Sequence, residues 1–308
     1  MSAHRPMTAF EWSLLILLSL LWGGSFFFIA VSITALPPFT VVFLRCLIGA
    51  AGLLIVLAIM RQSVPLTRET IHAFAGMGLL NNVIPQSLIV WAQGSLTSGH
   101  ASILNATAPF FTILILHLMT TNERATPLKV LGVVIGFTGV AAMIGLDVMA
   151  NSGSIWPQLA MLAAACCYGF AGLWGRRFAT MGIPPVATAT GQLACSSAML
   201  LGLALVIEHP LSLPMPSLKV WAAVVALALL STALAYVVFF RIMATAGATN
   251  LSLVTLLIPV SAILLGILFL GEALYPRQIV GMALIGIGLG CIDGRLIQWL
   301  LPARKPVP

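Results

Sequence analysis

The amino-acid sequence predicts an all-α integral membrane protein whose ten transmembrane helices form two inverted repeats of five. Three observations support this fold class: the composition, a succession of long apolar segments and an internal repeat. Hydrophobic residues make up 60% of the 308 residues and charged residues only 7%, whereas a soluble domain has about 25% charged residues. The mean hydropathy is +1.11. This composition is typical of a chain that lies in a lipid bilayer.

Ten apolar segments are long enough to cross a bilayer core of about 30 Å, which requires about 20 helical residues. They lack the alternating pattern of a transmembrane β-barrel, so each is expected to be a helix. The first is interpreted as a retained span, because Pro37 and Pro38 follow it instead of a small-residue cleavage site. The expected spans are residues 12–33, 39–60, 71–95, 98–119, 128–146, 155–174, 185–206, 220–243, 250–270 and 276–292.

The distribution of basic residues orients these helices. The opposite loops hold only Lys219 and Arg277, and Arg45 lies within a span. Cytoplasmic loops carry the excess of Lys and Arg, so both termini are predicted to be cytoplasmic. Because the basic residues follow the loops and do not form one face, we expect no nucleic-acid partner. The cytoplasmic set holds Arg5, Arg61, Arg68, Arg124, Lys129, Arg176, Arg177, Arg241, Arg295, Arg304 and Lys305.

The second half of the chain repeats the first at shifts of 146 to 150 residues. Because five spans is an odd number, the second copy must cross the membrane in the opposite sense. We expect residues 1–148 and 149–308 to form the two repeats, an arrangement typical of secondary transporters. Matched pairs include Trp22 with Tyr168, Pro37 with Pro184, Leu79 with Leu229, Ser102 with Ser252, Pro109 with Pro259 and Glu123 with Glu272.

Several motifs resemble those of the EamA-type family of the drug/metabolite transporter superfamily. They are LLWGGSFF at 20–27, PPFTVVFLR at 37–45, and NERATPLKVLGVVIGFTGV at 122–140, which is matched by GEALYPRQIVGMALIGIGLG at 271–290. The resemblance covers residues 12–146 and 155–292 and is greatest to bacterial ten-span exporters of aromatic and neutral amino acids. It implies an inner-membrane carrier that exports such metabolites by alternating access; the alternative is export of drugs, nucleobases or other amphiphiles. We expect a monomer in the lipid bilayer with a small-molecule substrate and no cofactor.

Four amide side chains stand out in the third span. At 100° per residue, Asn82, Gln86 and Gln93 fall within about 40° of one another, while Asn81 points about 100° away. An amide without a hydrogen-bond partner in hydrocarbon costs several kcal/mol. The stripe is therefore expected either to line a hydrated cavity or to hold neighbouring helices together.

The other candidates lie at equivalent places in both halves. Thr232 and Tyr236 occupy the positions of Asn82 and Gln86, and Trp22 and Tyr168 place rings beside glycines in mid-span. Prolines in the fourth and ninth spans free backbone carbonyls beside polar residues. Trp91 lies opposite the amide stripe. The expected substrate-binding residues are Trp22, Ser25, Asn82, Gln86, Trp91, Gln93, Asn105, Pro109, Tyr168, Thr232, Tyr236, Ser252, Thr255 and Pro259.

Arg45 is the single charge well inside a span. It can meet a substrate carboxylate, or it can reach the outer surface with its long side chain and serve a structural role, which is the favoured hypothesis. All seven acids lie at span ends or in loops. Small multidrug relatives use a buried glutamate in the first helix, where this chain has Ser25 and phenylalanines. This departure argues against proton-coupled export of cations.

The sequence offers little for catalysis or metal binding. None of the five histidines forms an HExxH motif, and no span holds a pair of acids. The five cysteines all lie within spans without a CxxC spacing, which favours packing over disulfide or metal roles. We therefore expect no catalytic residue and no metal site, and a protein that is not an enzyme.

Overall fold

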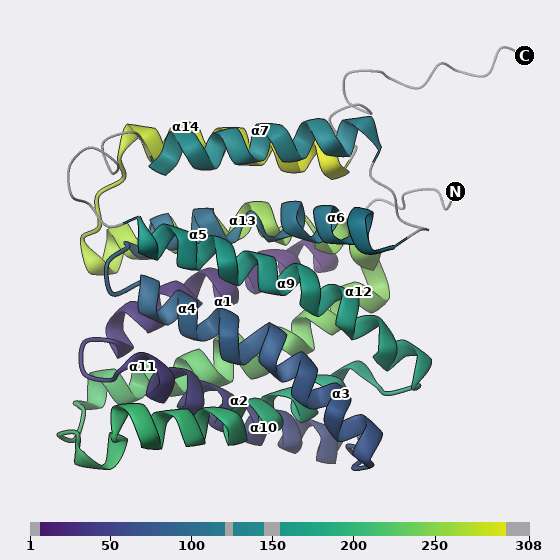
Figure 1. Ribbon diagram of the computed structural model, residues 1–308, viewed down its shortest axis with the longest axis vertical. Coiled ribbons are helices and arrows are strands. Elements are labelled where there is room, and N and C mark those ends of the chain that lie inside the picture. The colour runs from purple at the N-terminus through teal and green to yellow at the C-terminus, as the bar shows by residue number, and fades with distance from the viewer. Residues whose placement is uncertain (1–6, 121–125, 145–154, 294–308) are drawn as a thin grey trace, which may run out of the picture.

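The computed structural model describes residues 7–120, 126–144 and 155–293, and every regular element among them is helical (Figure 1). The elements η1, η2 and η4 are π-helical, and η3 is a 3-10 helix. The helices are α1 (Ala9–Ser32), α2 (Pro38–Ile59), α3 (Arg68–Gly78), η1 (Leu79–Val83), α4 (Ile84–Ala92), α5 (Ser98–Asn105), α6 (Ala108–Met119), α7 (Pro127–Ile144), α9 (Trp156–Thr180), α10 (Pro185–Leu203), η2 (Ala204–Glu208), η3 (Pro210–Ser212), α11 (Leu218–Ala228), η4 (Leu229–Leu234), α12 (Ala235–Leu251), α13 (Val254–Leu270) and α14 (Pro276–Asp293).

These elements combine into ten apolar helical rods, which pack against one another in a bundle (Figure 1). Eight helical segments have the length and hydropathy needed to cross a membrane, and α13 and α14 are shorter apolar helices. The prediction of an all-α membrane protein with ten helices is confirmed. Glu123, one of the repeat matches, lies outside the described residues.

Two spans extend clearly beyond their expected bounds: the eighth, expected to end at residue 243, continues to Ala248, and the sixth extends further still. The sixth span was expected to end at residue 174, but α9 continues to Thr180. Its last turns carry the guanidinium of Arg177, whose Cζ lies 3.3 Å from the centre of the Trp174 ring. The helix ends before Gly182, which has a positive φ of 65°. Hydropathy detects where apolar residues stop, whereas a helix continues until a backbone signal ends it.

Local signals begin several helices. In the capping box of α1, Glu11 N donates to Thr8 Oγ1 at 3.2 Å, and Thr8 N donates to Glu11 Oε2 at 2.8 Å. Helices α2 and α10 begin with a proline in the first turn, where the missing N–H leaves no backbone bond unmade. Each of these starts therefore follows from the residues at the boundary.

The closest helix pairs each join the two halves of the chain. They are α7 with α14, α1 with α13, α2 with α10, and α4 with α9. Helices α7 and α14 form the most extensive pair and lie together at the top of Figure 1. Their backbones touch at glycines: a Cβ on Gly132 would lie 2.6 Å from Gly288 O, and one on Gly139 would lie 2.8 Å from Gly281 O. Small residues allow this approach in a membrane.

Three of the ten rods are irregular near their middle. The π-helical segment η1 interrupts the third rod, and η4 interrupts the eighth about 150 residues later, which is the shift of the sequence repeat. In the fourth rod, α5 ends at Asn105 and α6 restarts with Pro109 in its first turn. Irregular backbone at this depth is tolerated where protein or water satisfies the freed polar groups, and all three irregular segments border the cavity described below.

Candidate functional site

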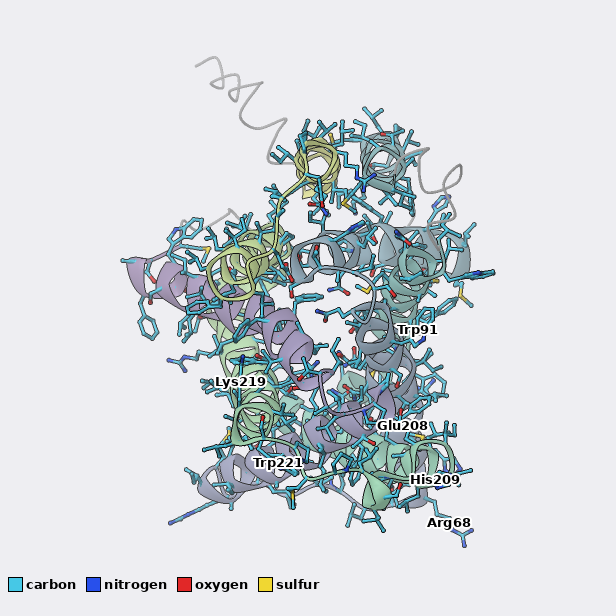
Figure 2. The ribbon with its side chains drawn as sticks, turned by 90° about the vertical axis from the view of Figure 1, so that its left-hand side faces the viewer. Arg68, Trp91, Glu208, His209, Lys219 and Trp221 are labelled. Carbon is cyan, nitrogen blue, oxygen red and sulfur yellow. The ribbon has the colours of Figure 1, made fainter. Side chains whose placement is uncertain are left out.

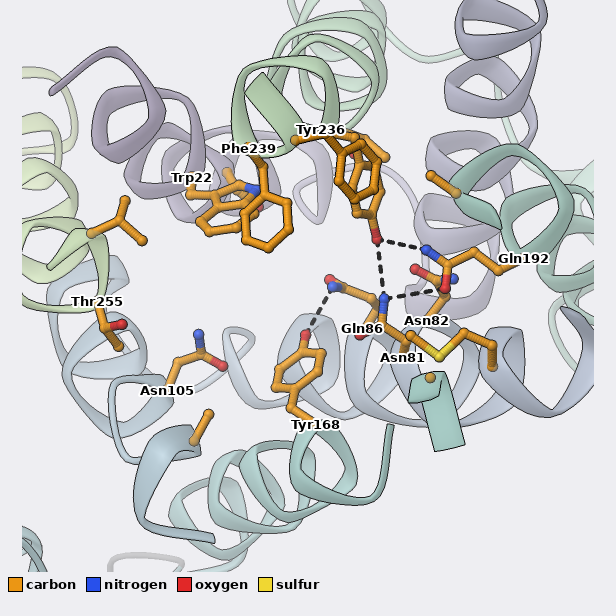
Figure 3. Close-up of a pocket in the computed structure, with 18 of the residues that line it drawn as sticks. Trp22, Asn81, Asn82, Gln86, Asn105, Tyr168, Gln192, Tyr236, Phe239 and Thr255 are labelled. Carbon is orange, nitrogen blue, oxygen red and sulfur yellow. Dashed lines mark hydrogen bonds between the residues drawn. The ribbon is translucent and has the colours of Figure 1, made fainter. Parts of the chain in front are cut away.

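A cavity of about 840 Å³ lies in the centre of the bundle, between helices of both halves. One part of its wall is polar and another is aromatic, as Figure 3 shows. Its polar and aromatic lining residues are Trp22, Ser25, Phe26, Arg45, Asn81, Asn82, Gln86, Asn105, Thr112, Tyr168, Phe178, Thr188, Gln192, Ser231, Thr232, Tyr236, Phe239, Phe240 and Thr255.

A chain of hydrogen bonds around Arg45 builds the first part of the polar wall. The side chain of Arg45 is only 7% exposed. Its Nε donates to Thr232 Oγ1 at 2.9 Å, and its Nη1 donates to Gln86 Oε1 at 2.7 Å. The Nε2 of Gln86 then donates to the Tyr168 hydroxyl at 2.9 Å. Four helices from the two halves thus meet at one guanidinium and one amide.

A second cluster surrounds the hydroxyl of Tyr236. It accepts hydrogen bonds from Asn81 Nδ2 and from Gln192 Nε2, each at 3.0 Å (Figure 3). Asn81 reaches this site because η1 departs from regular α-helical geometry, so its neighbours do not follow the uniform 100° per residue. The expectation that Asn81 points away from the site was therefore wrong.

The aromatic wall lies across from the amides. The rings of Trp22 and Phe239 are 5.5 Å apart, and those of Tyr236 and Phe240 are stacked at 5.8 Å. Figure 3 shows Trp22 and Phe239 together on one side of the cavity. Such rings present large apolar faces to a ligand. The cavity therefore offers one polar region and one region suited to an apolar group.

Ten of the fourteen residues expected from the sequence line this cavity. The structure brings together Trp22, Ser25, Asn82, Gln86, Asn105, Pro109, Tyr168, Thr232, Tyr236 and Thr255. Asn82 also donates to Ser196 Oγ at 3.2 Å, so it links α10 to η1 while facing the cavity. Lining the cavity and holding helices together are therefore not exclusive alternatives, because several amides do both.

Four expected residues do not line the cavity. Trp91 lies on the outer surface of the bundle, and 51% of its side chain is exposed (Figure 2). Gln93 is buried, and its Nε2 donates to Phe26 O at 2.9 Å. Ser252 is exposed in the turn before α13. Pro259 is buried inside α13, where this helix packs on α1. Gln93 lies ten residues, or nearly three helical turns, beyond the π-helical segment and is not among the residues that line the cavity.

Arg45, Asn81, Gln192, Phe239 and Phe240 line the cavity but were not among the expected site residues. Arg45 does not reach the outer surface as the favoured hypothesis required, because Thr232 and Gln86 hold it inside. The internal repeat pairs Arg45 with Gln192 at a shift of 147, and this match was a usable signal. The two phenylalanines follow Tyr236 by three and four residues, the spacing of one helix face.

The cavity extends towards one end of the bundle. Its lining includes Ala179 and Ile183 at the junction of α9 and α10, and Val254 in the first turn of α13. Among the described residues, the loops 33–37, 93–97, 209–217 and 271–275 at the other end contribute no lining residue. There, Phe26 O accepts from both Gln93 Nε2 at 2.9 Å and Ser98 Oγ at 3.3 Å.

A carboxylate closes the same end. The Oε1 of Glu272, in the loop after α13, accepts from Ser98 N at 2.8 Å, and its Oε2 accepts from Gly99 N at 3.2 Å. These amides are at the N-terminus of α5, where unpaired N–H groups favour an anion. This contact joins the two halves of the chain at the end of the bundle where none of the described loops lines the cavity.

Comparison with known proteins agrees with this architecture. The model of the EamA-like transporter family matches residues 10–145 and 155–292. The uncharacterized inner membrane transporter YedA of Escherichia coli K12 is 30% identical over 94% of this chain and 92% of its own length. The uncharacterized transporter YoaV of Bacillus subtilis is 27% identical over 89% of this chain and 94% of its own.

A crystal structure with 20% sequence identity superposes with a TM-score of 0.65 and covers 93% of this chain and 98% of its own. At that identity the likeness concerns the fold alone. The family match covers nearly all of the ten helices. The chain is thus a multi-pass inner-membrane transporter that belongs to the EamA-like transporter family.

Proposed function

We propose that this transporter exports small neutral or zwitterionic metabolites, foremost aromatic and other neutral amino acids, by alternating access through the central cavity. The observation that carries the proposal is the cavity itself. Its volume of about 840 Å³ falls in the range of roughly 300–1,000 Å³ that small-molecule sites occupy. Its hydrogen-bonding wall suits the polar end of an amino acid, and its aromatic wall suits the side chain.

Asn105 supports a zwitterionic ligand. This residue faces the cavity (Figure 3), and among the described residues its Oδ1 has no hydrogen-bond partner. An amide that no neighbour holds can turn to present its oxygen to an ammonium group. The aromatic wall lies nearby, so a ligand of amino-acid size can contact both.

The asymmetry of the two ends supports alternating access. If the basic loops face the cytoplasm, the end that the cavity approaches is cytoplasmic, and the end closed by Glu272 is periplasmic. The conformation is then inward-facing. We also propose that residues 1–148 and 149–308 are the two inverted repeats whose exchange of conformation opens the opposite end. The π-helical segments at equivalent places in the third and eighth spans support this division.

The aromatic cluster of Trp22, Phe239 and Phe240 also suits flat amphiphiles such as nucleobases or drugs, which keeps this class as the second candidate. Purified protein in liposomes preloaded with labelled amino acids, nucleobases and cationic dyes distinguishes the two. Efflux of neutral amino acids supports the proposal. Movement of dyes alone, dependent on a pH gradient, contradicts it.

The role of the cavity is tested by Asn105→Leu. This change removes a polar group without breaking a hydrogen bond within the described residues, so the fold should persist. Efflux is expected to fall about tenfold, the loss of one hydrogen bond to a charged ligand group. Efflux at the level of the unmodified protein would show that Asn105 is not part of the substrate site.

A further inference from the structure

Hydrogen-bond direction around the polar wall is strongly one-sided. The amide oxygen of Gln86 already accepts from Arg45, and the amide oxygen of Gln192 lies 3.5 Å from Asn81 Nδ2. The Thr232 hydroxyl accepts from Arg45 and gives its own proton to Leu227 O at 3.0 Å. The oxygens of Gln86 and Thr232, which are the nearest acceptors to Arg45, are therefore occupied by protein donors.

Three hydrogen-bond donors of this wall, by contrast, have no acceptor among the described residues. The Tyr168 hydroxyl accepts from Gln86, and the Tyr236 hydroxyl accepts from two amides. Neither hydroxyl donates its own proton to any described residue. The Nη2 of Arg45 likewise has no partner among the described residues, although Nε and Nη1 of the same guanidinium are bound. Two O–H groups and one guanidinium nitrogen thus remain for a ligand.

The charge of this wall is also uncompensated. Arg45 stays protonated at physiological pH, and it is the single charged side chain among the described residues that line the cavity. Both of its partners within hydrogen-bond distance are neutral oxygens. A guanidinium inside a membrane protein is costly unless an anion or water answers it. Gln86 connects Arg45 to the Tyr168 hydroxyl, because its Oε1 accepts from Arg45 and its Nε2 donates to Tyr168. Figure 3 shows both tyrosine hydroxyls on the side of the cavity where Gln86 lies.

We propose that Arg45, Tyr168 and Tyr236 form a carboxylate-binding subsite, so that the transporter takes substrates by a carboxylate group and rejects the corresponding amides and amines. This inference rests on the proposed function and narrows its substrate class. A carboxylate oxygen accepts only, which matches the unused donors of Arg45, Tyr168 and Tyr236, and its negative charge neutralises that of Arg45. An amino-acid amide carries a net positive charge and lacks the anionic acceptor, so the same wall disfavours it.

The test uses three matched compounds for each side chain, titrated by calorimetry into the full-length protein in lipid nanodiscs. They are leucine, leucinamide and 4-methyl-2-oxopentanoate, and then phenylalanine, phenylalaninamide and phenylpyruvate. The amino acid and the 2-oxo acid should bind, and the amide should bind at least about tenfold more weakly, which is the loss of a charge-assisted hydrogen bond. Arg45→Gln should abolish this discrimination. The control Arg68→Gln removes the same charge from the exposed start of α3 and should preserve it.

Tyr168→Phe and Tyr236→Phe keep the test valid if Arg45→Gln does not yield a folded, monodisperse protein. Each change removes one hydroxyl and retains the ring. Each should weaken binding of the carboxylates about three- to tenfold and leave the affinity for the amides unchanged. Carboxylate affinity that is unchanged in both variants overturns the proposal.

The outcomes separate this inference from the proposed function. If acids and amides bind the unmodified protein equally well, the carboxylate subsite is refuted, while efflux of amino acids from liposomes would still support the exporter. If the 2-oxo acids bind in an Arg45-dependent manner but no amino acid leaves the liposomes, the proposed substrate class fails and the subsite stands.

Discussion

The contact between Glu272 and the start of α5 gives a quantitative test of alternating access. Its carboxylate accepts Ser98 N and Gly99 N at 2.8 and 3.2 Å, one amide on each oxygen. The side chain occupies the space above Gly266, where a Cβ would collide with the carboxylate. Glu272→Gln keeps the size of this side chain but leaves a single acceptor oxygen, and its NH₂ group faces an N–H that it cannot bind.

The expected magnitude follows from those two bonds. A hydrogen bond to a charged group contributes about 1.5–3 kcal/mol, and a neutral one about 0.5–1.5 kcal/mol. The substitution removes one charged bond and weakens the other, and it also removes an interaction of about 0.3–1 kcal/mol between the carboxylate and the helix N-terminus. Allowing for partial solvent exposure, the closed end loses about 2–3 kcal/mol. This corresponds to a shift of roughly 30- to 150-fold towards the state in which this end is open.

The shift is measured by electron–electron double resonance between spin labels at Ser95 and Ala273, two exposed loop residues on either side of the contact. In lipid nanodiscs the unmodified protein should give mainly the short distance. Glu272→Gln should add a longer population. An unchanged distance distribution in the variant would refute the argument that this carboxylate holds its end of the bundle closed.

Glu208 provides a matched control. Its carboxylate accepts Phe39 N at 2.8 Å and Thr40 N at 2.7 Å at the start of α2, so Glu208→Gln makes the same chemical change at another helix N-terminus. Neither Glu208 nor these partners line the cavity. Glu208→Gln should lower the melting temperature and leave the distance between the two labels as it is in the unmodified protein.

Two further predictions concern packing and the aromatic wall. Gly136→Val should lower the free energy of unfolding by about 1–3 kcal/mol, because a Cβ at this position would collide with the Phe110 ring. Gly172→Ala, where a Cβ meets open space, should not lower it. The measurement is the melting temperature in detergent, and equal melting temperatures for the two variants would contradict the packing argument. Trp22→Leu should weaken binding of an aromatic substrate about tenfold, while Trp91→Leu on the outer surface should leave this affinity unchanged. A larger loss of affinity in Trp91→Leu than in Trp22→Leu would contradict the assignment of Trp22 to the aromatic wall.

Much of the fold could be predicted because the length and apolar composition of membrane-spanning helices identify them in the sequence. The apolar segments located all ten rods, and most bounds lie within a few residues of the observed ones. Prediction failed where the backbone departs from an ideal helix. Asn81 was assigned away from the site by a uniform 100° per residue, and the π-helical turn at 79–83 removes that uniformity. No composition rule signals such a turn.

The candidate site was predictable in its chemistry but not in its pairings. Polar residues in apolar spans correctly indicated Gln86 and Tyr236 as cavity residues. The environment of Arg45 depends on Thr232, which lies 187 residues later in the chain, and helical periodicity carries no information across that separation. The prediction that Gln93 lines the cavity was wrong because its amide donates to the carbonyl of Phe26 instead of facing the cavity.

The pairing of α7 with α14 has a consequence for how the protein is made. The glycine-lined face of α7 packs mainly against α14, the last helix among the described residues. A ribosome delivers α7 to the bilayer more than a hundred residues before α14 is synthesised, so α7 must wait in lipid without that partner. This layer can therefore assemble only after residues 276–293 have been synthesised, and a nascent chain that stops before residue 276 leaves the glycine-lined face of α7 without its main partner.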